Sequence, residues 1–373
     1  MKHILIGTVA VIVVGMTVQA AAPVKVGVYY YPWHGPNAGG HGFDTTLRSH
    51  LAPAQQPKLG FYNNKDPNVI EAHIQQSVRG NIDFWACSWW GPGGFEDKVL
   101  RNVILPHPSA SKLHYAIMYE STGRLGAADN PNYDNLQKDF KYFQENYFNH
   151  PCYLKIDDRP AVFIYLTRVY FRDRGRQALA DLRAAFPEVY LVGDDIFGPN
   201  YRPASPVLWD AVTAYDVYGQ TLAPEGSTGK AQERLKEILA DAAESAHRAG
   251  IGLIPFASPG FNDRGVRSGH NAAPRYFLDV PDSAEGDVFR AMLRDVVVPA
   301  VDPLADRILM VTSFNEWHED TQIEPTVGKQ AVTSGDDSDD GEQYTQGYRY
   351  VDYGNLYLDI LREETEGMYM DEQ

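Results

Sequence analysis

The sequence predicts a single α/β domain, a (β/α)8 TIM barrel with long loops at the carboxyl ends of its strands. Strand-like apolar runs alternate with helix-like stretches along most of the 373-residue chain, which is typical of a parallel sheet with crossover helices. The runs are almost continuously apolar, as strands covered on both faces are. A chain of this length is also long for one domain unless that domain is an α/β barrel.

Eight runs qualify as strands because they are rich in β-branched and aromatic residues and stop at glycine, proline or polar residues. In chain order they cover residues 24–31, 82–90, 113–119, 161–166, 189–192, 211–215, 251–257 and 308–314. The first run ends at Pro32, and a long loop bearing glycine and proline follows it to about residue 60. A long loop in a compact domain is usually functional.

Helix-like stretches fill most of the gaps between these runs. Asp66 and Pro67 mark a helix start, because aspartate caps a first turn and proline fits the first helical position. The clear helices cover residues 66–78, 135–146, 174–186, 230–249 and 285–297. An open doubly wound sheet would give similar local signals, but no glycine-rich phosphate loop follows the first strand and no dinucleotide-binding fingerprint occurs.

The first twenty residues have the pattern of a secretory signal peptide. Lys2 and His3 precede an apolar stretch from residue 4 to residue 18, and Ala20 is small enough to precede the cleavage site. We therefore expect residues 1–20 to be removed, residues 21–373 to form the barrel domain, and the product to be secreted or periplasmic. A retained membrane anchor is the alternative, although the apolar stretch is short for a bilayer span and no later stretch is long enough.

The composition argues against some partners and favours others. The formal net charge of −16 argues against binding to nucleic acid or to an anionic membrane surface, since both select basic patches. The chain has 23 tyrosines, 16 phenylalanines and 6 tryptophans, a supply that suits stacking on sugar faces as well as core packing. We expect a monomer that binds an oligosaccharide or polysaccharide, with no membrane contact once the signal peptide is removed.

Neither the cysteines nor the histidines predict a metal site or another cofactor. Two cysteines supply neither a disulfide framework nor a four-ligand zinc set. Cys87 lies in a strand-like run where we expect a buried free thiol, and a single bridge formed in an oxidising compartment is the alternative. His34, His41 and His50 lack the close spacing of metal ligands. The acidic residues 335–342 fit a solvated loop better than a calcium-binding helix-loop-helix.

The most informative stretch follows the last predicted strand. There the apolar run stops at Asn315-Glu316-Trp317-His318-Glu319, which places two carboxylates three residues apart among aromatic rings. Unequal burial of such a pair can leave one carboxyl group protonated near pH 7 and the other ionised, as acid and base catalysis on sugars requires. A strand followed by an ordinary polar loop is the alternative interpretation.

Further polar and aromatic residues lie at the ends of the predicted strands, which converge on one face of a barrel. Most are carboxylates, amides and rings, a set that suits a polyhydroxylated ligand, and few lysines or arginines join them. For Asp194, Asp195 and Asp216, capping or orienting a neighbour is at least as reasonable as ligand contact. Tyr30 and Tyr31 both end the first run. The strand-end candidates for substrate binding are Tyr30, Trp90, Glu120, Tyr218, Asp263, Arg267 and Asn315.

Several of these stretches form recognisable motifs. They are Tyr29-Tyr-Tyr-Pro-Trp33, Ser88-Trp-Trp-Gly91, Pro259-Gly-Phe-Asn-Asp263 with Arg267, and above all Phe314-Asn-Glu-Trp-His-Glu-Asp-Thr-Gln-Ile-Glu324. With them, the chain after the signal peptide resembles glycoside hydrolase family 99, the endo-α-mannosidases and endo-α-1,2-mannanases, over nearly its whole length. The resemblance implies a (β/α)8 barrel without a metal, in agreement with the strand count.

The resemblance also implies a reaction and the residues that perform it. The reaction would be retaining, endo-acting hydrolysis of α-mannosidic linkages in α-mannan or mannose-rich glycans, through a 1,2-anhydro sugar. By position, Glu316 would take the proton of the substrate's 2-hydroxyl, and Glu319 would protonate the leaving oxygen. The positions that match sugar-binding places of the family are Tyr30, Glu120, Tyr215 and, in the first loop, His50.

Two stretches depart from the family pattern. The first loop has Arg48-Ser49-His50 where the family has a Trp-Asn-His run, and residues 166–170 lack an acidic residue that is common there. The resemblance places both stretches facing the substrate and away from the scissile bond, so the exact glycan, the linkage and any preference for decorated substrates stay open. A hydrolase of a different α-linked polysaccharide and a catalytically silent glycan-binding barrel are the alternatives.

Overall fold

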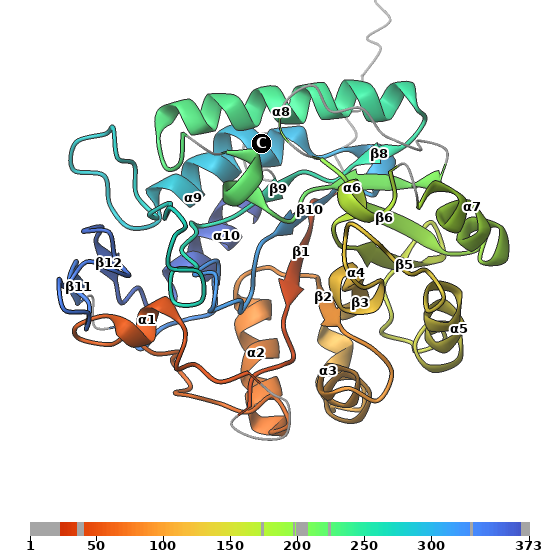
Figure 1. The fold of residues 1–373 in the computed structure, drawn as a ribbon, viewed down its shortest axis with the longest axis horizontal. Coiled ribbons are helices and arrows are strands. Elements are labelled where there is room, and N and C mark those ends of the chain that lie inside the picture. The colour runs from red at the N-terminus through yellow and green to blue at the C-terminus, as the bar shows by residue number, and fades with distance from the viewer. Residues whose placement is uncertain are drawn as a thin grey trace, which may run out of the picture.

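The computed structural model describes residues 23–35, 41–172, 175–196, 198, 208–222, 225–328 and 331–366. The predicted signal peptide lies outside them. Within them, one central sheet is parallel except for a short added strand, and helices surround it (Figure 1). None of the helices in these ranges combines the length and the apolar character that a membrane crossing requires.

The parallel strands follow one another around the sheet in chain order. β4 is the exception, since it adds to β5 in antiparallel pairing, and β11 and β12 form a separate antiparallel pair. The strands are β1 Lys25–Tyr30, β2 Phe84–Trp89, β3 His114–Tyr119, β4 Lys155–Ile156, β5 Arg159–Ile164, β6 Tyr190–Asp194, β7 Ala211–Thr213, β8 Gly252–Leu253, β9 Phe256–Ala257, β10 Ile308–Val311, β11 Val332–Thr333 and β12 Tyr350–Val351.

One interrupted strand closes the sheet into a ring. β8 pairs with β7 and β9 pairs with β10, and only Ile254 and Pro255 separate the two pieces. Ile254 N donates to Val212 O at 2.9 Å, and Pro255 O accepts from Met310 N at 2.9 Å. Proline has no N–H for the ladder, which accounts for the interruption. Because β8 and β9 are halves of one strand, the ring has eight strands and is the predicted (β/α)8 barrel.

Each of the eight predicted strand runs contains strands of the ring. The short β4, β11 and β12 were not predicted, because pieces of two residues carry no measurable periodicity. Every predicted helix is also present, and the Asp66 side chain caps its helix by accepting from Asn68 N at 2.9 Å. The predicted helix 285–297 is an α-helix that continues as one π turn, Leu293–Val297.

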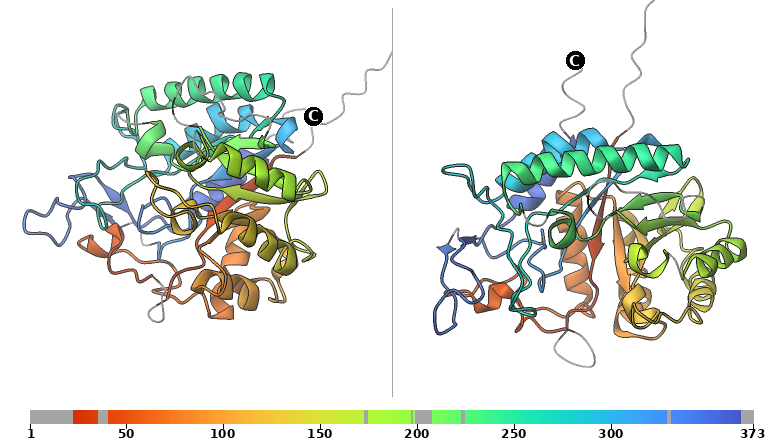
Figure 2. Two further views of the ribbon diagram at one scale, coloured as in Figure 1. Left: turned by 45° about the vertical axis from the view of Figure 1, so that its right-hand side comes forward. Right: turned by 45° about the horizontal axis from the view of Figure 1, so that its top comes forward.

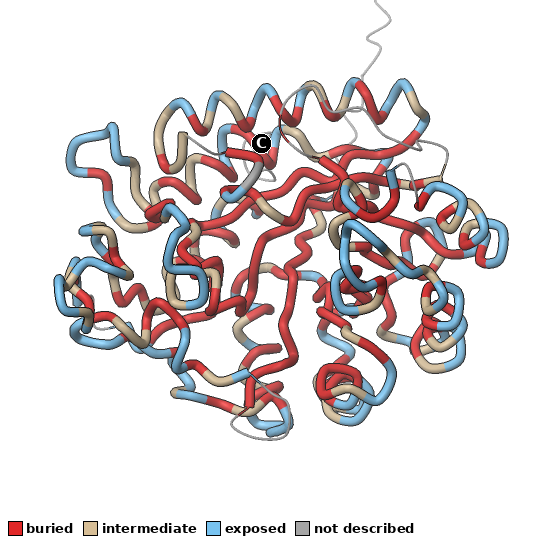
Figure 3. The backbone as a smooth tube through the Cα atoms, in the orientation of Figure 1, coloured by how far each residue is buried: buried red, intermediate tan, exposed pale blue. Residues whose placement is uncertain are grey.

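The longer helices lie outside the strands, with α8 running along one side of the ring (Figures 1 and 2). The buried backbone occupies the middle of the molecule, and exposed segments lie on the outer helices and loops (Figure 3). The helices are α1 Leu47–His50, α2 Pro67–Arg79, α3 Phe95–Val99, α4 Ser121–Arg124, α5 Leu136–Asn146, α6 Thr167–Tyr170, α7 Arg176–Ala185, α8 Gly229–Arg248, α9 Asp287–Met292 and α10 Leu356–Glu366.

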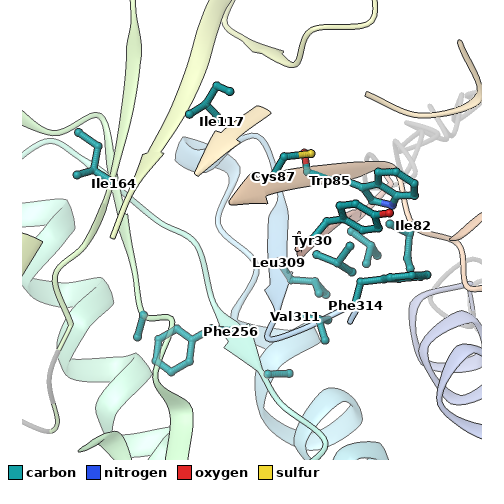
Figure 4. Close-up of a cluster of buried hydrophobic side chains, with 14 of the residues drawn as sticks. Tyr30, Ile82, Trp85, Cys87, Ile117, Ile164, Phe256, Leu309, Val311 and Phe314 are labelled. Carbon is teal, nitrogen blue, oxygen red and sulfur yellow. The ribbon is translucent and has the colours of Figure 1, made fainter. Parts of the chain in front are cut away.

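The core has two layers because side chains alternate along each strand. One set points outward and packs under the helices, and Figure 4 shows part of it around Trp85 and Phe314. The other set fills the barrel interior, where Tyr29 of β1 contacts Phe163 of β5 at a ring distance of 6.3 Å, although these strands are not neighbours in the sheet. Cys87 belongs to the outer layer as a buried free thiol, as predicted.

The first loop and the C-terminal region meet beside the carboxyl ends of the strands. α1 lies next to the β11–β12 pair in Figure 1 and in both views of Figure 2. Leu51 forms a β-bridge with Asp336, and Ala52 N donates to Gly335 O at 3.1 Å. This contact joins two segments that are far apart in the sequence at the rim of the barrel.

Candidate active site

The segment after β10 carries the two candidate catalytic glutamates, and hydrogen bonds fix its path. The Ser313 hydroxyl accepts from Glu316 N at 2.8 Å and lies 2.9 Å from the Thr321 hydroxyl. Glu319 O accepts from Asn262 N at 2.7 Å, which ties the segment to the loop after β9. Both glutamates are therefore held at the carboxyl end of the barrel, where barrel enzymes place their chemistry.

Glu316 is buried, with an exposed fraction of 2%, but its carboxylate has close partners. Oε1 accepts the backbone N–H of His318 at 2.9 Å. The ring nitrogen Nδ1 of His318 lies 3.3 Å from the same oxygen. Hydrogen bonds donated to a carboxylate favour its charged form, so the surroundings of Glu316 suit a base.

Glu319 has different surroundings. Its side chain is 21% exposed, and Arg267 Nη1 lies 3.6 Å from Oε1. The Tyr215 hydroxyl donates to Oε2 at 3.2 Å. Burial and then the negative charge of Glu316 raise the pKa of Glu319 to about 8, although Arg267 opposes the shift. Near pH 7 Glu319 therefore carries a proton, as a general acid must.

Glu120 brings a third carboxyl group to the site from the end of β3. The Ser88 hydroxyl donates to Glu120 Oε1 at 2.6 Å, and Trp90 Nε1 donates to Ser88 Oγ at 2.9 Å. Burial raises the pKa of Glu120 to about 8. Gly123 makes room for the indole, because a Cβ there would lie 2.3 Å from Cε3 of Trp90. The structure thus brings the predicted residues Glu120 and Trp90 together through Ser88.

Two tyrosines of the barrel interior connect the first strand to Glu319. The Tyr31 hydroxyl donates to the Tyr215 hydroxyl at 2.6 Å, and the Tyr215 hydroxyl donates to Glu319. Burial, and then the charges of Glu120, Glu316 and Glu319, raise the pKa of Tyr31 well above its usual value. Tyr31 is therefore a neutral hydroxyl placed among all three carboxyl groups.

Tyr30, which was predicted to bind substrate, does not lie at this site. Its ring stacks on Trp85 at a centroid distance of 4.0 Å in the layer outside the strands (Figure 4). Its hydroxyl lies 2.9 Å from His73 Nδ1, and its exposed fraction is 0%. The prediction for Tyr30 is wrong because adjacent side chains of a strand point to opposite faces. Tyr31 is the residue that points into the barrel.

Asn315 was also predicted to bind substrate, and the structure gives it a positioning role. Its side chain is fully buried. Oδ1 accepts from Tyr31 N at 2.7 Å, and Nδ2 donates to Tyr31 O at 2.9 Å. Both ends of the amide are occupied by the backbone of one residue, so Asn315 fixes the end of β1 and with it Tyr31.

His50 lies in the contact between the first loop and the C-terminal region. Its ring stacks on Tyr344 at 4.1 Å, and its Nδ1 lies 3.1 Å from Asp337 Oδ1. It does not line the cavity beside Glu319. The structure therefore gives no support to the predicted substrate contact of His50. The ring instead joins the first loop to the C-terminal region.

A cavity of about 510 Å³ opens beside Glu319. On its wall, Asp263 Oδ2 accepts from Arg267 at 2.7 Å and lies 2.9 Å from His270 Nδ1. Asp263 Oδ1 is buried and has no hydrogen-bond partner among the described residues, so it is an acceptor suited to a ligand hydroxyl. Other residues that line the cavity are Tyr165, Tyr215, Asp216, Tyr218, Phe261 and Asn271.

Sequence reasoning missed Ser88, Tyr165 and His270 at this site. Ser88 and Tyr165 belong to the inward-pointing set of their strands, so counting in steps of two from Ala86 and Phe163 would have found them. His270 lies in a loop that carries no such signal. Within the described ranges, no three histidine, cysteine, aspartate or glutamate side chains are grouped as metal ligands would be.

Comparison with known proteins links the chain to one family. The family model described as "Glycosyl hydrolase family 99" matches residues 25–180, a stretch that contains Glu120 and ends before Glu316. The Mus musculus protein named "Glycoprotein endo-alpha-1,2-mannosidase" is 23% identical over 327 residues, which are 83% of this chain and 63% of the relative. A Danio rerio protein named "Glycoprotein endo-alpha-1,2-mannosidase-like protein" is 24% identical over 300 residues, 76% of this chain and 61% of the relative.

These relatives are longer than the chain, which spans less than two thirds of their length. Among solved structures, the GH99 endo-alpha-mannosidase from Bacteroides thetaiotaomicron superimposes with a TM-score of 0.62 at 18% identity. The superposition covers 92% of this chain and 97% of that one. At this level of identity the likeness establishes the shared fold.

Proposed function

We propose that the chain is a member of glycoside hydrolase family 99, whose model matches residues 25–180, and that it is an endo-acting glycoside hydrolase that cleaves α-mannosidic linkages in α-mannan or mannose-rich glycans. The observation that carries the proposal is the unlike pair of glutamates after β10. Glu319, whose pKa is raised to about 8, supplies a proton. Glu316, whose Oε1 accepts from His318 N and lies 3.3 Å from His318 Nδ1, supplies a base.

The reaction proceeds in two steps through a 1,2-anhydro sugar. In the first, Glu316 takes the proton of the 2-hydroxyl, whose oxygen attacks the anomeric carbon. The bond to the leaving oxygen breaks as Glu319 donates its proton to that oxygen. In the second, ionised Glu319 takes a proton from water, the water oxygen attacks the anomeric carbon, and the opened 2-oxygen regains its proton from Glu316. Two inversions at one carbon give net retention.

Three surrounding groups serve this reaction. Tyr215 donates to Glu319 and sets the direction of its carboxyl group. Asp263 offers a free oxygen to a substrate hydroxyl on the wall of the cavity. Trp90, held by Ser88, offers a ring face for a sugar. Neither glutamate has to reach the anomeric carbon, so the two carboxyl groups need not have the close spacing of enzymes that form a glycosyl-enzyme.

A substrate panel tests this function. We expect the protein to release reducing oligosaccharides from α-1,2-mannan or yeast α-mannan, and Glu316→Gln and Glu319→Gln to abolish the release while the protein stays folded. Release of reducing ends only from another α-linked polysaccharide would identify a different substrate class on the same scaffold. Tight binding of an oligosaccharide with no release by the unaltered protein would identify a glycan-binding barrel without activity.

We also propose that the protein works outside the cytoplasm, on the strength of the signal-like pattern of residues 1–20. The proposal predicts a mature form that begins at Ala21. N-terminal sequencing of the protein recovered from the medium or the periplasm of its native cells checks this. An intact Met1 on the protein from these cells would contradict it.

A further inference from the structure

His318 separates Glu316 from Glu319 in the sequence and contacts a main-chain oxygen on its other side. Its Nε2 lies 3.0 Å from Gly42 O, in the loop after β1. A carbonyl oxygen only accepts hydrogen bonds, so Nε2 must carry a hydrogen. The tautomer of the ring is thereby fixed by the first loop, and any second proton has to reside on Nδ1.

Nδ1 lies 3.3 Å from Glu316 Oε1, close enough for an ion pair although the two atoms are not aligned for a hydrogen bond. Without a hydrogen, Nδ1 would present a lone pair to the negatively charged oxygen, an arrangement that is repulsive. With a hydrogen, the ring is an imidazolium that forms an ion pair with the carboxylate. Both groups are buried, with side-chain exposures of 11% for His318 and 3% for Glu316, so water does little to weaken their interaction.

The other groups around His318 do not compete for the second proton of its ring. His34 stacks on the ring at 5.9 Å, and His41 meets it edge-on at 5.7 Å. Burial lowers the pKa of both these histidines, so they are neutral neighbours. Burial also opposes the charge on His318, but Glu316, the Gly42 carbonyl and the more distant Asp44 outweigh it, and the pKa of His318 is raised.

Among the residues that the structure describes, Glu319 has no equivalent partner. Its nearest cation, Arg267, is 53% exposed and 3.6 Å away, and it shares its guanidinium with Asp263 at 2.7 Å. We propose that His318 is a positioning residue that assigns the roles of the two glutamates: its imidazolium holds Glu316 as an oriented carboxylate, so that the proton of the pair of glutamates resides on Glu319. The effect of His318 on catalysis rests on the proposed function. The charged state of His318 and its contact with Glu316 rest only on the structure of the free protein.

The physical content is tested without any substrate. In protein labelled with ¹⁵N-histidine, we expect the His318 ring to be protonated on both nitrogens at pH 6.5, with its resonances assigned by their loss in H318N. Glu316→Gln should then lower the pH at which His318 titrates by about one unit or more, because an adjacent carboxylate favours the imidazolium. A neutral His318 at pH 6, or a titration unchanged by E316Q, would overturn the proposal even if the enzyme proves fully active.

The catalytic consequence is tested with two variants of opposite geometry. The amide nitrogen of H318N occupies the place of Nδ1, facing Glu316, whereas that of H318Q occupies the place of Nε2, facing Gly42 O. Neither carries a charge, so the acid limb of kcat/KM should move to higher pH by about one unit or more in both. H318N should retain the larger kcat because its amide N–H groups still face Glu316.

A purely structural role for His318, anchoring the first loop, gives the opposite order. H318Q would then be the more active variant, and the acid limb would stay at its wild-type pH, which would overturn the proposal. His114→Gln is the matched control, because His114 is exposed at the start of β3, at the other end of the barrel. If the unaltered enzyme cleaves no α-mannan, the proposed function fails, and the ¹⁵N result still decides the state of His318.

Discussion

Glu316 and Glu319 lie three positions apart in the sequence and have different roles in the proposed reaction. In that reaction Glu319 gives its proton to the leaving oxygen. A glycosyl fluoride departs without a proton, so Glu319→Gln should retain much of its rate on an α-mannosyl fluoride. Glu316→Gln should lose about 10²–10⁴-fold on the same fluoride, because the 2-hydroxyl still needs its base. Fluoride-release kinetics of both variants measure this.

Equal rescue of both variants by the fluoride would show that the two roles are wrongly assigned. A second substrate gives an independent check of the same chemistry. An α-mannoside analogue that lacks the 2-hydroxyl should bind to the unaltered protein and resist cleavage. Rapid turnover of this 2-deoxy compound would show that no 1,2-anhydro sugar forms. Another group would then have to act as the nucleophile in place of the 2-oxygen.

The pH dependence follows from the raised pKa of Glu319. Its acid form is the active one, so kcat/KM should fall as the pH rises through about 8. Arg267 stabilises the ionised form, so Arg267→Gln should raise this pKa and move the basic limb to higher pH. The shift should stay below about one unit, because the guanidinium is half exposed and screened by solvent. A basic limb that moves to lower pH in Arg267→Gln would contradict the assignment.

The predicted site residues that lie inside the ring differ in one physical respect from those that do not. Glu120, Trp90 and Tyr215 lie at the carboxyl ends of strands with their side chains inside the ring, where strand order alone brings them together. Tyr30 also lies at a strand end, but its side chain points outward. The prediction considered its place in the motif and not the alternation of side chains along the strand. Asn315 also follows a strand, and no local pattern shows that a backbone segment already occupies both ends of its amide.

At the scale of elements, a buried ion cluster holds the catalytic segment against two other loops. Arg48 Nε donates to Asp320 Oδ1 at 2.6 Å, and Arg275 Nε lies 3.4 Å from Asp320 Oδ2. All three side chains are at most 2% exposed. Asp320 directly follows Glu319, so α1 and the loop after β9 both help to fix the position of the proposed general acid.

Asp320→Asn leaves two buried guanidinium groups without their counter-charge. We expect it to lower the free energy of unfolding by about 3–5 kcal/mol, measured by urea denaturation. Asp337→Asn is the matched control, because Asp337 is 57% exposed and pairs with His50 at the surface, and it should cost less than about 1 kcal/mol. Equal losses in the two variants would show that the cluster does not stabilise the segment.

Sequence reasoning treated Arg48 as a departure from a family pattern at a substrate-facing position. The structure instead buries it in the ion cluster, paired with a residue 272 positions away. Composition and periodicity describe only local stretches of sequence. They therefore cannot reveal an ion pair between residues this far apart. Helix α2 is the opposite case, because its cap, its proline and its apolar spacing all lie within one short stretch.

At the scale of the whole molecule, closure of the ring requires small residues inside it. Gly27 of β1 lies in the interior, where a Cβ would be 2.1 Å from Phe84 Cζ and 2.5 Å from Met310 Sδ. We expect Gly27→Ala to destabilise the protein by about 1–3 kcal/mol through overpacking. Gly269→Ala, where a Cβ meets nothing within 4 Å, should change stability by much less. Similar unfolding midpoints for both would contradict this packing.

The barrel itself was predictable because each of its strands lies in a near-continuous apolar run and helix-like stretches fill most of the gaps between these runs. The interruption of the seventh strand of the ring was not predictable. It arises at Pro255, which lies within an apolar run and pairs through its carbonyl group alone. Local propensity describes each half of this strand, but only the closed ring shows that the two halves pair with different neighbours.

Proton NMR of the first product formed from an α-1,2-linked manno-oligosaccharide tests the proposed reaction. We expect new reducing ends from internal cleavage, first as the α-anomer and only later as the equilibrium mixture, with no formation in Glu316→Gln or Glu319→Gln. The β-anomer as first product, or no new reducing ends with the unaltered protein, would contradict the proposed reaction.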